Sequence, residues 1–512
     1  MTVLAGNEII DQFEIELAPD EPDFWVSLDV GPHVGKKARI EVDQMREDSK
    51  GLAAIRQSDE VPDAENLYKE KYRPQFHFSS RRGWNNDPNG LVYYKGEYHL
   101  FYQHNPYGWN WGNMHWGHAV SRDLVHWQEL PVALYPDELG TMFSGSAVVD
   151  SHNTAGFQEG PESPVVCIYT AAGGTNFRSQ GQPFTQCIAY SLDRGRSWKK
   201  YEKNPALPHI IGRNRDPKVI WHEDSKKWVM ALYLDKNDFA LFGSNDLKTW
   251  KRLCDVAVPG TSECPEFFEI PVDGNKSNTR WVFYGGNGSY LVGRFDGTTF
   301  KAELGPHALN YGNCFYASQT FNNIPPDDGR RIQIAWGRVG HPDMPFNQMM
   351  DFPVELTLRT TDEGLRLFAQ PVREIERLHR KKHTWQNVAL KEGDNPLEGI
   401  AGDLFHIVAE FKVGDARQFG FTIRGASVTY HVQNQALSCR EKTAPLKPTD
   451  GKIQLEILVD RTSVEIFAND GRLYMPIGVI PPDDNHKLEV FTLGGETQVR
   501  SLEVFELHTA WK

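Results

Sequence analysis

Three short acidic motifs are the places in this chain where side chains could do chemistry. They are Trp84-Asn85-Asn86-Asp87-Pro88-Asn89-Gly90, Arg215-Asp216-Pro217 and Glu263-Cys264-Pro265. If the three carboxyls shared one pocket, they would repel one another and their pKa values would be pushed apart. A pocket with one ionised and one protonated carboxyl has the charge states that cleavage of a glycosidic bond requires.

Each motif also has a purely structural interpretation. The Asn86–Gly90 stretch is a good turn sequence, and Arg215-Asp216 could be a surface ion pair in front of a strand. Glu263-Cys264-Pro265 could have no role at all. Catalysis is favoured because all three motifs stand at equivalent points of an internal repeat.

The repeat is a Ser-x-Asp sequence followed closely by an aromatic residue. The copies are Ser121-Arg122-Asp123…Trp127, Ser191-Leu192-Asp193…Trp198, Ser244-Asn245-Asp246…Trp250 and the weaker Phe295-Asp296-Gly297…Phe300 and Thr361-Asp362-Glu363-Gly364…Phe368. Five copies at this spacing, with β-type sequence between them, predict a five-bladed β-propeller. The acidic motifs then begin blades one, three and four. Since the first strand of a blade lines the central channel, Asp87, Asp216 and Glu263 are predicted to converge there.

The sequence predicts an all-β chain with four parts. Residues 1–70 form an N-terminal β segment with strands expected at 13–17, 24–28 and 38–42. Residues 71–370 form the propeller, 371–383 a linker helix and 384–512 a C-terminal β-sandwich. The helix prediction rests on Val372, Ile375 and Leu378, and the basic residues at 379–383 are interpreted as its solvated end.

Composition excludes several other classes. The net charge of −13 argues against nucleic acid or an anionic membrane as the partner. No apolar run is long enough for a membrane span, and the first residues lack the features of a secretory signal. The chain would thus be cytoplasmic if complete, and secreted or periplasmic if trimmed. The six cysteines form no C-x-x-C pair, and His115 and His118 lack a third ligand, so no metal is expected.

Two further segments could wall a sugar pocket. Residues 103–118 are dense in aromatic and amide side chains, and Phe143-Ser144-Gly145-Ser146 opens blade two. In the second segment the hydroxyls could bind sugar, or the glycine could simply allow close strand packing.

Together, W-x-N-D-P-N-G, Q-x-N-P-x-G-x-x-W-G, F-S-G-S, R-D-P and E-C-P resemble glycoside hydrolase family 32, which contains invertases, inulinases and levanases. The resemblance covers roughly residues 72–512. It implies a five-bladed propeller joined to a β-sandwich, cleavage of β-fructofuranosides with retention, and no metal or organic cofactor. The commoner motif has Met where this chain has Asn85.

By this resemblance, Asp87 is the nucleophile, Glu263 the acid/base and Asp216 the transition-state stabiliser. The resemblance also implies a fructose pocket formed by Asn86, Gln103, Trp111, Phe143, Ser144, Arg215 and Trp336. The chemistry requires an ionised Asp87 and a Glu263 that holds a proton, and Asp216 beside Arg215 is expected to stay ionised.

The prediction is an exo-acting, retaining β-fructofuranosidase that releases terminal fructose from sucrose, inulin or levan. Three alternatives stay open: a fructosyltransferase using the same site, an inverting enzyme that cleaves arabinan or xylan, and a non-catalytic fructan-binding module. An inverting site needs carboxyls roughly 6.5–9.5 Å apart, whereas a retaining site has them about 5 Å apart. The sequence leaves open whether the chain forms a homodimer.

Overall fold

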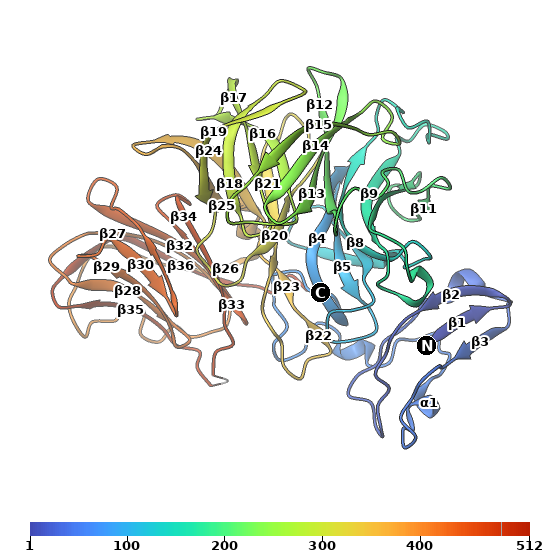
Figure 1. Cartoon of the computed structure of the whole chain (residues 1–512). Coiled ribbons are helices and arrows are strands. Elements are labelled where there is room, and N and C mark those ends of the chain that lie inside the picture. The colour runs from blue at the N-terminus through green and yellow to red at the C-terminus, as the bar shows by residue number, and fades with distance from the viewer. Residues whose placement is uncertain (483, 512) are drawn as a thin grey trace.

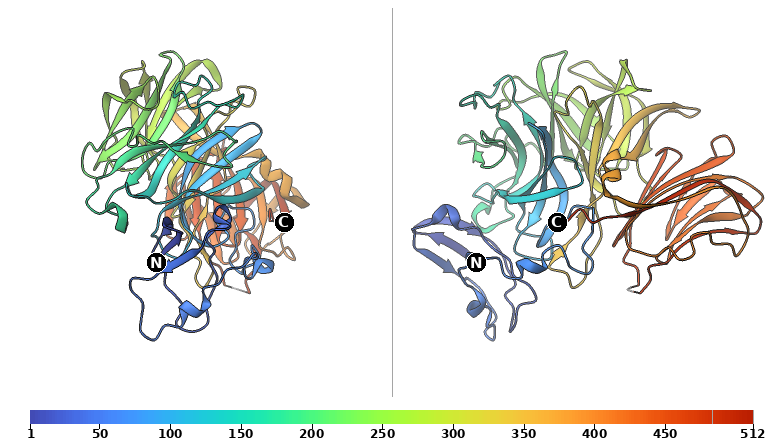
Figure 2. Two further views of the ribbon diagram at one scale, coloured as in Figure 1. Left: turned by 90° about the vertical axis from the view of Figure 1, so that its right-hand side faces the viewer. Right: turned by 180° about the vertical axis from the view of Figure 1, so that it is seen from behind.

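The computed structural model describes residues 1–482 and 484–511, and it is built almost wholly of strands (Figure 1). A small N-terminal sheet and a larger two-sheet unit lie on different sides of a central propeller (Figures 1 and 2). Helical segments in these residues are one or two turns long, among them α1 (Gly51–Ala54). The predicted fold class, an all-β propeller followed by a β-sandwich, is therefore confirmed.

The N-terminal sheet differs in part from the expectation. It has the order β2-β1-β3, with β1 at Thr2–Ala5, β2 at Glu8–Gln12 and β3 at Ala38–Glu41. The third predicted strand is thus confirmed, but the strands predicted at 13–17 and 24–28 are wrong. Their alternating pattern arises because Phe13, Ile15, Val26 and Leu28 pack into one small hydrophobic cluster without pairing as strands.

The propeller can be followed as five antiparallel units of four strands each, which agrees with five blades. The strands are β4 (Gly83–Tyr94), β5 (Glu97–Asn105), β6 (His115–Ser121) and β7 (Trp127–Leu134); β8 (Thr141–Val149), β9 (Val165–Ala172), β10 (Thr185–Ser191) and β11 (Lys199–Lys200); β12 (Arg215–His222), β13 (Lys227–Asp235), β14 (Asp238–Ser244) and β15 (Lys251–Ala257); β16 (Glu266–Val272), β17 (Asn275–Tyr284), β18 (Ser289–Phe295) and β19 (Phe300–Ala308); β20 (Tyr316–Thr320), β21 (Arg331–Gly337), β24 (Val354–Thr361) and β25 (Gly364–Pro371). The fifth unit closes on the first through β22 (Phe346–Asn347), which pairs in parallel with β4.

The repeated Ser-x-Asp sequence forms the turn between the third and fourth strands of a blade. In blade three, Asp246 Oδ1 accepts the backbone N–H groups of Lys248 and Thr249, at 2.9 and 2.8 Å. Asp123, Asp193 and Asp296 make the same kind of contact in blades one, two and four. The repeat is recognisable because each of these four turns needs an acceptor for its otherwise unpaired backbone donors.

Buried polar side chains tie the inner strands together around the axis. Asn322 Nδ2, just after β20, donates to Ala147 O in β8 and Val219 O in β12, at 2.8 and 2.9 Å. The buried Lys218 ammonium contacts Glu266 at 3.1 Å and donates to Thr320 O at 2.7 Å. These bonds link four of the five blades, including blades three and four, which carry two of the acidic motifs.

The linker helix predicted over 371–383 is wrong in type and extent. A 3-10 helix occupies only Arg373–Leu378, and strand β26 (His379–Leu390) follows at once. Val372, Ile375 and Leu378 are buried and recur every third residue, which is the period of a 3-10 helix. The basic residues at 379–383 belong to β26, where they pair with β36 (Thr497–Leu507), and do not end a helix.

The C-terminal unit is a sandwich of two sheets. One has the order β26-β36-β27-β32-β33-β34 and the other β31-β30-β29-β28-β35. The remaining strands are β27 (Phe405–Lys412), β28 (Gln418–Ile423), β29 (Ala426–His431), β30 (Ala436–Cys439), β31 (Lys442–Pro445), β32 (Lys452–Asp460), β33 (Ser463–Ala468), β34 (Leu473–Gly478) and β35 (Leu488–Leu493). Their inward-facing side chains form one hydrophobic core of their own.

A buried charge cluster joins the sandwich to the propeller. His77 lies between two sandwich carboxylates, with Nδ1 2.8 Å from Asp460 and Nε2 2.8 Å from Glu465. Burial opposes protonation, but hydrogen bonds to both carboxylates prevail and raise the pKa of His77 to about 10. The Asp460 carboxylate also accepts the backbone N–H groups of Gln75 and Phe76, so the two domains meet in a fully bonded polar contact.

Candidate active site

Most residues of the acidic motifs lie where regular strand pairing breaks down. The register between β4 and β5 shifts between Asn85 and Pro88, which places Asp87 in a bulge. A second shift at Phe143/Gly145 contains Ser144, and a third at Arg215/Lys218 contains Asp216. Bulges redirect a side chain out of the alternating pattern, so these three side chains can turn toward the axis.

The backbone is also strained at two of the three acids. Asp216 has a φ of 64° and Glu263 a φ of 45°, both in the left-handed region that non-glycine residues seldom adopt. Cys264 follows with a φ of 44°. Such conformations cost about 1–3 kcal/mol each and are held in place only by surrounding structure, which is typical of functional sites.

Cys264 shows that the three motifs converge. Its Sγ lies 3.6 Å from Asp87 Oδ2 and 3.5 Å from Asp216 Oδ2, and its backbone N–H donates to Asp216 Oδ2 at 3.0 Å. Glu263 is the adjacent residue. The acidic motifs of blades one, three and four therefore lie close together around Cys264.

Asp87 accepts hydrogen bonds on both carboxyl oxygens. Ser144 Oγ donates to Oδ2 at 2.6 Å, and Asn86 Nδ2 donates to Oδ1 at 3.1 Å. Trp84 Nε1 in turn donates to Asn86 Oδ1 at 2.8 Å, which orients the amide. These donors favour the ionised form and hold the carboxylate in one orientation.

Arg215 links the other two acids. Its guanidinium donates to Glu263 Oε2 and lies 3.5 Å from Asp216 Oδ2. Tyr316 Oη donates to the other Glu263 oxygen, Oε1, at 2.6 Å. Although burial opposes it, the two carboxyls raise the pKa of Arg215, so its positive charge is permanent.

Burial decides the protonation of the two aspartates. It raises the pKa of Asp87, and the Glu263 charge adds to the rise, while the hydrogen bonds from Ser144 and Asn86 reduce it. Burial also raises the pKa of Asp216 to about 7, against the effect of Arg215 and with help from Glu263 and Asp87. Burial therefore opposes the expected ionisation of Asp216, and the neighbouring Arg215 offsets that effect only in part.

The predicted sugar-binding side chains surround this centre. Trp336 stands edge-on to Trp84, with ring centroids 6.1 Å apart, and edge-on to Tyr316 at 6.2 Å. Trp111 meets Phe143 edge-on at 5.9 Å, next to Ser144. Gln103 is buried and donates to Met142 O at 2.8 Å, so it supports the strand beneath Phe143.

The unusual Asn85 does not reach the pocket. Its side chain is fully buried, and its Oδ1 accepts weakly from Ser80 N and Oγ, at 3.4 and 3.5 Å. Asn85 therefore contributes none of the hydrogen bonds that Asp87 receives.

Comparison with known proteins agrees with this geometry. Residues 77–371 match the family model of the glycosyl hydrolases family 32 N-terminal domain, and residues 374–506 match the family 32 C-terminal model. The chain belongs to glycoside hydrolase family 32.

Relatives and solved structures cover similar shares of this family 32 chain. A levanase of Bacillus subtilis is 42% identical, over 87% of this chain and 72% of its own length. The extracellular exo-inulinase inuE of Aspergillus niger is 32% identical, over 87% of this chain and 96% of its own. The crystal structure of exo-inulinase from Aspergillus awamori superimposes with a TM-score of 0.78 at 30% identity, covering 87% of this chain and all of that one.

The sequence did not single out Tyr316 or Tyr233. Tyr316 donates to Glu263. The Arg215 guanidinium lies over Tyr233, with its central carbon 4.7 Å from the centre of the Tyr233 ring. Both tyrosines line a groove of about 440 Å³ beside Glu263, together with Lys236, Asn237, Gly260, Thr261, Ser262 and Asn287. Tyr316 begins the first strand of blade five, so the repeat that located the acids could have pointed to it.

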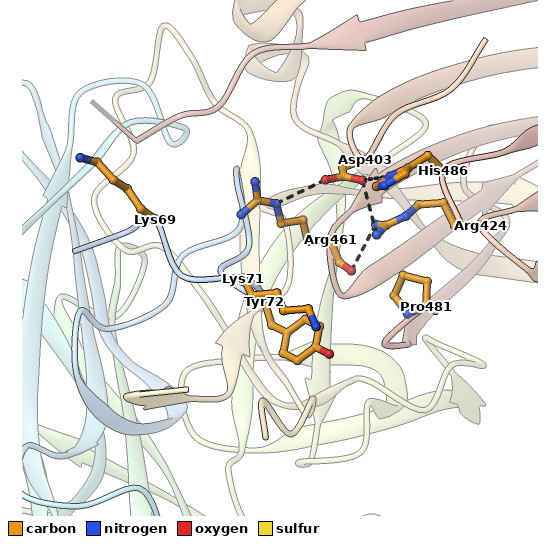
Figure 3. Close-up of a pocket in the computed structure, with 8 residues that line it drawn as sticks. All are labelled: Lys69, Lys71, Tyr72, Asp403, Arg424, Arg461, Pro481 and His486. Atoms are coloured by element: carbon orange, nitrogen blue, oxygen red, sulfur yellow. Dashed lines mark hydrogen bonds and ion pairs between the residues drawn. The ribbon is translucent and has the colours of Figure 1, made fainter. Parts of the chain in front are cut away.

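A second cavity of about 270 Å³ lies where the chain enters the propeller against the sandwich (Figure 3). Asp403 lies at its centre, within 3.6 Å of Arg424, Arg461 and His486, and Lys69, Lys71, Tyr72 and Pro481 complete the lining. It contains none of the predicted site residues.

Two further observations concern other kinds of site. Within residues 1–482 and 484–511, no group of three or more His, Cys, Asp or Glu side chains could hold a metal ion. His115 and His118, whose spacing suggested one, contact Asp11 and His99 instead. No helix in the same residues is long and apolar enough to cross a membrane.

Proposed function

We propose that this family 32 protein is an exo-acting, retaining β-fructofuranosidase that releases terminal fructose from sucrose or a fructan. The observation that carries the proposal is the convergence of Asp87, Asp216 and Glu263 around Cys264. Relatives described as levanase, exo-inulinase and fructan beta-fructosidase support the fructan substrate.

In the first step, an Asp87 carboxylate oxygen attacks the anomeric carbon of the terminal fructosyl unit. The bond from that carbon to the leaving oxygen breaks, and Glu263 gives its proton to that oxygen. The donors Ser144 and Asn86 hold Asp87 in position for this attack. The product is an ester between Asp87 and fructose, and the rest of the substrate leaves.

In the second step, the ionised Glu263 takes a proton from water while the water oxygen bonds to the anomeric carbon. The ester bond breaks, fructose leaves with its configuration retained, and Asp87 is again a carboxylate. Arg215 and Tyr316 both donate to Glu263 and stabilise it whenever it is ionised.

Asp216 is suited to hold hydroxyl groups of the fructosyl unit. With a pKa of about 7 it carries a proton in much of the population near neutral pH, so it can donate as well as accept. Its Oδ2 is already held by the Cys264 N–H, which leaves Oδ1 for the substrate.

A fructosyltransferase would use the same first step and differ only in the acceptor of the second. The groove beside Glu263 is where either water or a sugar hydroxyl would arrive. Exo action follows if the axial pocket accepts one terminal unit and the groove holds the rest. The homodimer stays a prediction.

The test is release of free fructose from sucrose, inulin and levan by wild type and Glu263→Ala. Glu269→Ala, which removes an exposed carboxyl of the same blade, is the matched control. We expect fructose as the first product from wild type and the control, and almost none from Glu263→Ala. Oligosaccharides without fructose would contradict exo action, and kestose without matching fructose at high sucrose would indicate transfer. Proton NMR of the first product distinguishes retention from inversion.

A further inference from the structure

The N-terminal module, residues 1–70, has no part in the proposed reaction. The family models begin at residue 77, so the module lies outside them. It nevertheless packs against one functional segment, the loop at 106–114 that joins β5 to β6. This loop is named the rim loop below.

The rim loop leaves blade one at the end where the nucleophile lies. Asn105, the last residue of β5, pairs with Trp84, and His104 pairs with Asn85, two residues from Asp87. Trp111 at the tip of the loop is 55% exposed and contacts Phe143 edge-on. Phe143 is followed by Ser144, which bonds Asp87, so this exposed indole lies on the side of the acids, and its flat face suits the C–H groups of a sugar ring.

The base of the rim loop is part of the core of the N-terminal module. Tyr107 is buried in a hydrophobic cluster whose other buried members are Val3 and Phe13. The Phe13 and Tyr107 rings stack with centroids 3.7 Å apart and planes 16° apart. The cluster combines residues of the module with Tyr107 of the loop, so each part helps to bury the other.

Asp11 holds both ends of the loop at once. It is only 2% exposed, and its Oδ2 accepts from Tyr107 Oη at the start of the loop and contacts His115 Nε2 at 3.1 Å just after its end. Burial favours protonation, but the bonds from His115 and Tyr107 prevail and lower the pKa of Asp11.

A third contact pins the loop close to Trp111. The Asn113 side chain accepts from Glu14 N at 2.8 Å and donates to Glu14 O at 2.7 Å, as a neighbouring strand would. On the opposite side, Asn347 Nδ2 donates to Trp109 O at 3.0 Å. The rim loop is thus clamped between the N-terminal module and blade five.

We propose that the N-terminal module is the outer support of the rim loop, and that it sets how tightly the enzyme holds the part of a fructan chain beyond the terminal fructosyl unit. The proposal rests on the proposed function, since it assigns substrate specificity to the same pocket. Asp11 and Phe13 are positioning residues that act through Trp111. The competing interpretation is that the module only stabilises blade one.

The first test compares sucrose with inulin for Asp11→Ala, with Asp20→Ala as control because Asp20 is an exposed carboxylate of the same module. We expect KM for inulin to rise about fivefold or more in Asp11→Ala while kcat on sucrose changes less than about twofold. In a Trp111→Ala background, Asp11→Ala should raise KM for inulin almost no further, because both changes remove the same contact between Trp111 and the fructan. Additive effects, or an equal loss on both substrates, would overturn the proposal.

The second test needs no substrate and measures amide hydrogen exchange of residues 106–114. In Asp11→Ala we expect this loop to exchange about tenfold faster or more, with β12–β15 unchanged. Asp11→Asn, which keeps an acceptor oxygen, should restore part of the protection. Unchanged exchange would overturn the support role. If the wild type released no fructose from any substrate, the proposed function would fail while this measurement still decided whether the module supports the loop.

Discussion

Aspartates occur in two contrasting regions of the propeller, at the channel and at the outer turns. Asp87 and Asp216 lie at the channel, where burial raises their pKa values. Asp246 lies at the turn of blade three, where backbone and side-chain hydrogen bonds lower its pKa although partial burial opposes them. One residue type thus serves two purposes, and the difference lies in solvent access and in the partners each carboxyl meets.

The comparison shows how each kind of site affects the stability of the fold. A turn carboxylate remains in contact with water and satisfies backbone donors, so ionising it stabilises the protein. A channel carboxylate is removed from water and placed near others of like charge, so ionising it destabilises the protein. Around these acids, buried bonds of Asn322 and Lys218 tie inner strands of blades two to five to one another.

The largest expected difference separates Asp87 from Asp246. Asp87→Asn should lower the rate of fructose release by at least about 10³-fold, because the amide cannot form the covalent intermediate. Asp246→Asn should leave the rate nearly unchanged. Initial rates on sucrose or inulin check this, with melting temperatures to show that both variants are folded. Equal losses would mean that the channel has no special role.

Asp216→Asn should combine a loss of rate with a gain of stability. Because the pKa of Asp216 is about 7 in the folded protein, above its ordinary value, its contribution to stability is full below about pH 4 and is lost as the pH rises through about 7. The uncharged amide avoids this loss.

Melting temperatures of wild type and Asp216→Asn, measured from pH 4 to pH 8, check the sign. The melting temperature of the variant should rise relative to that of the wild type as the pH rises. Its rate of fructose release should be about 10²-fold below the wild-type rate. A variant that lost stability toward high pH would show that Asp216 is ionised throughout.

Two tyrosines that each donate to a glutamate test the same contrast between the channel and the periphery. Tyr316 donates to Glu263 at the channel, and Tyr94 donates to Glu162 at the periphery at 2.9 Å. Tyr316→Phe should lower kcat about tenfold, since it removes a donor to the acid/base. Tyr94→Phe should change kcat less than about twofold. A similar change in both would argue against a catalytic role for the Tyr316 bond.

The smallest effect is expected at the turn itself. Asp246→Ala removes the acceptor for two backbone N–H groups and should cost about 1 kcal/mol of unfolding free energy. Because the pKa of Asp246 is lowered, this contribution is present above about pH 4 and disappears as the pH falls. The melting temperatures of wild type and Asp246→Ala should therefore differ more at pH 7 than at pH 3. A larger difference at pH 3 would contradict the assignment.

Repeats and periodicity predicted the parts of this fold whose contacts are local. The hairpin at Lys95-Gly96 and the turn at Asn469-Asp470-Gly471 have the positive φ angles expected of their residues. The prediction failed where a pattern had two interpretations. Phe13 and Ile15 alternate because they pack in a cluster with Tyr107 of the rim loop, and Ile375 and Leu378 belong to a 3-10 helix that begins directly after Val372.

By itself the sequence determined the family, the all-β class, the repeat and the three acids that meet in the channel. Those features follow from local motifs and from their order along the chain. Only the tertiary structure decided that burial raises the pKa of Asp216, that Tyr316 bonds Glu263, and that Asp11 contacts both ends of the rim loop. Each depends on burial and distance between residues far apart in sequence, which no local pattern records.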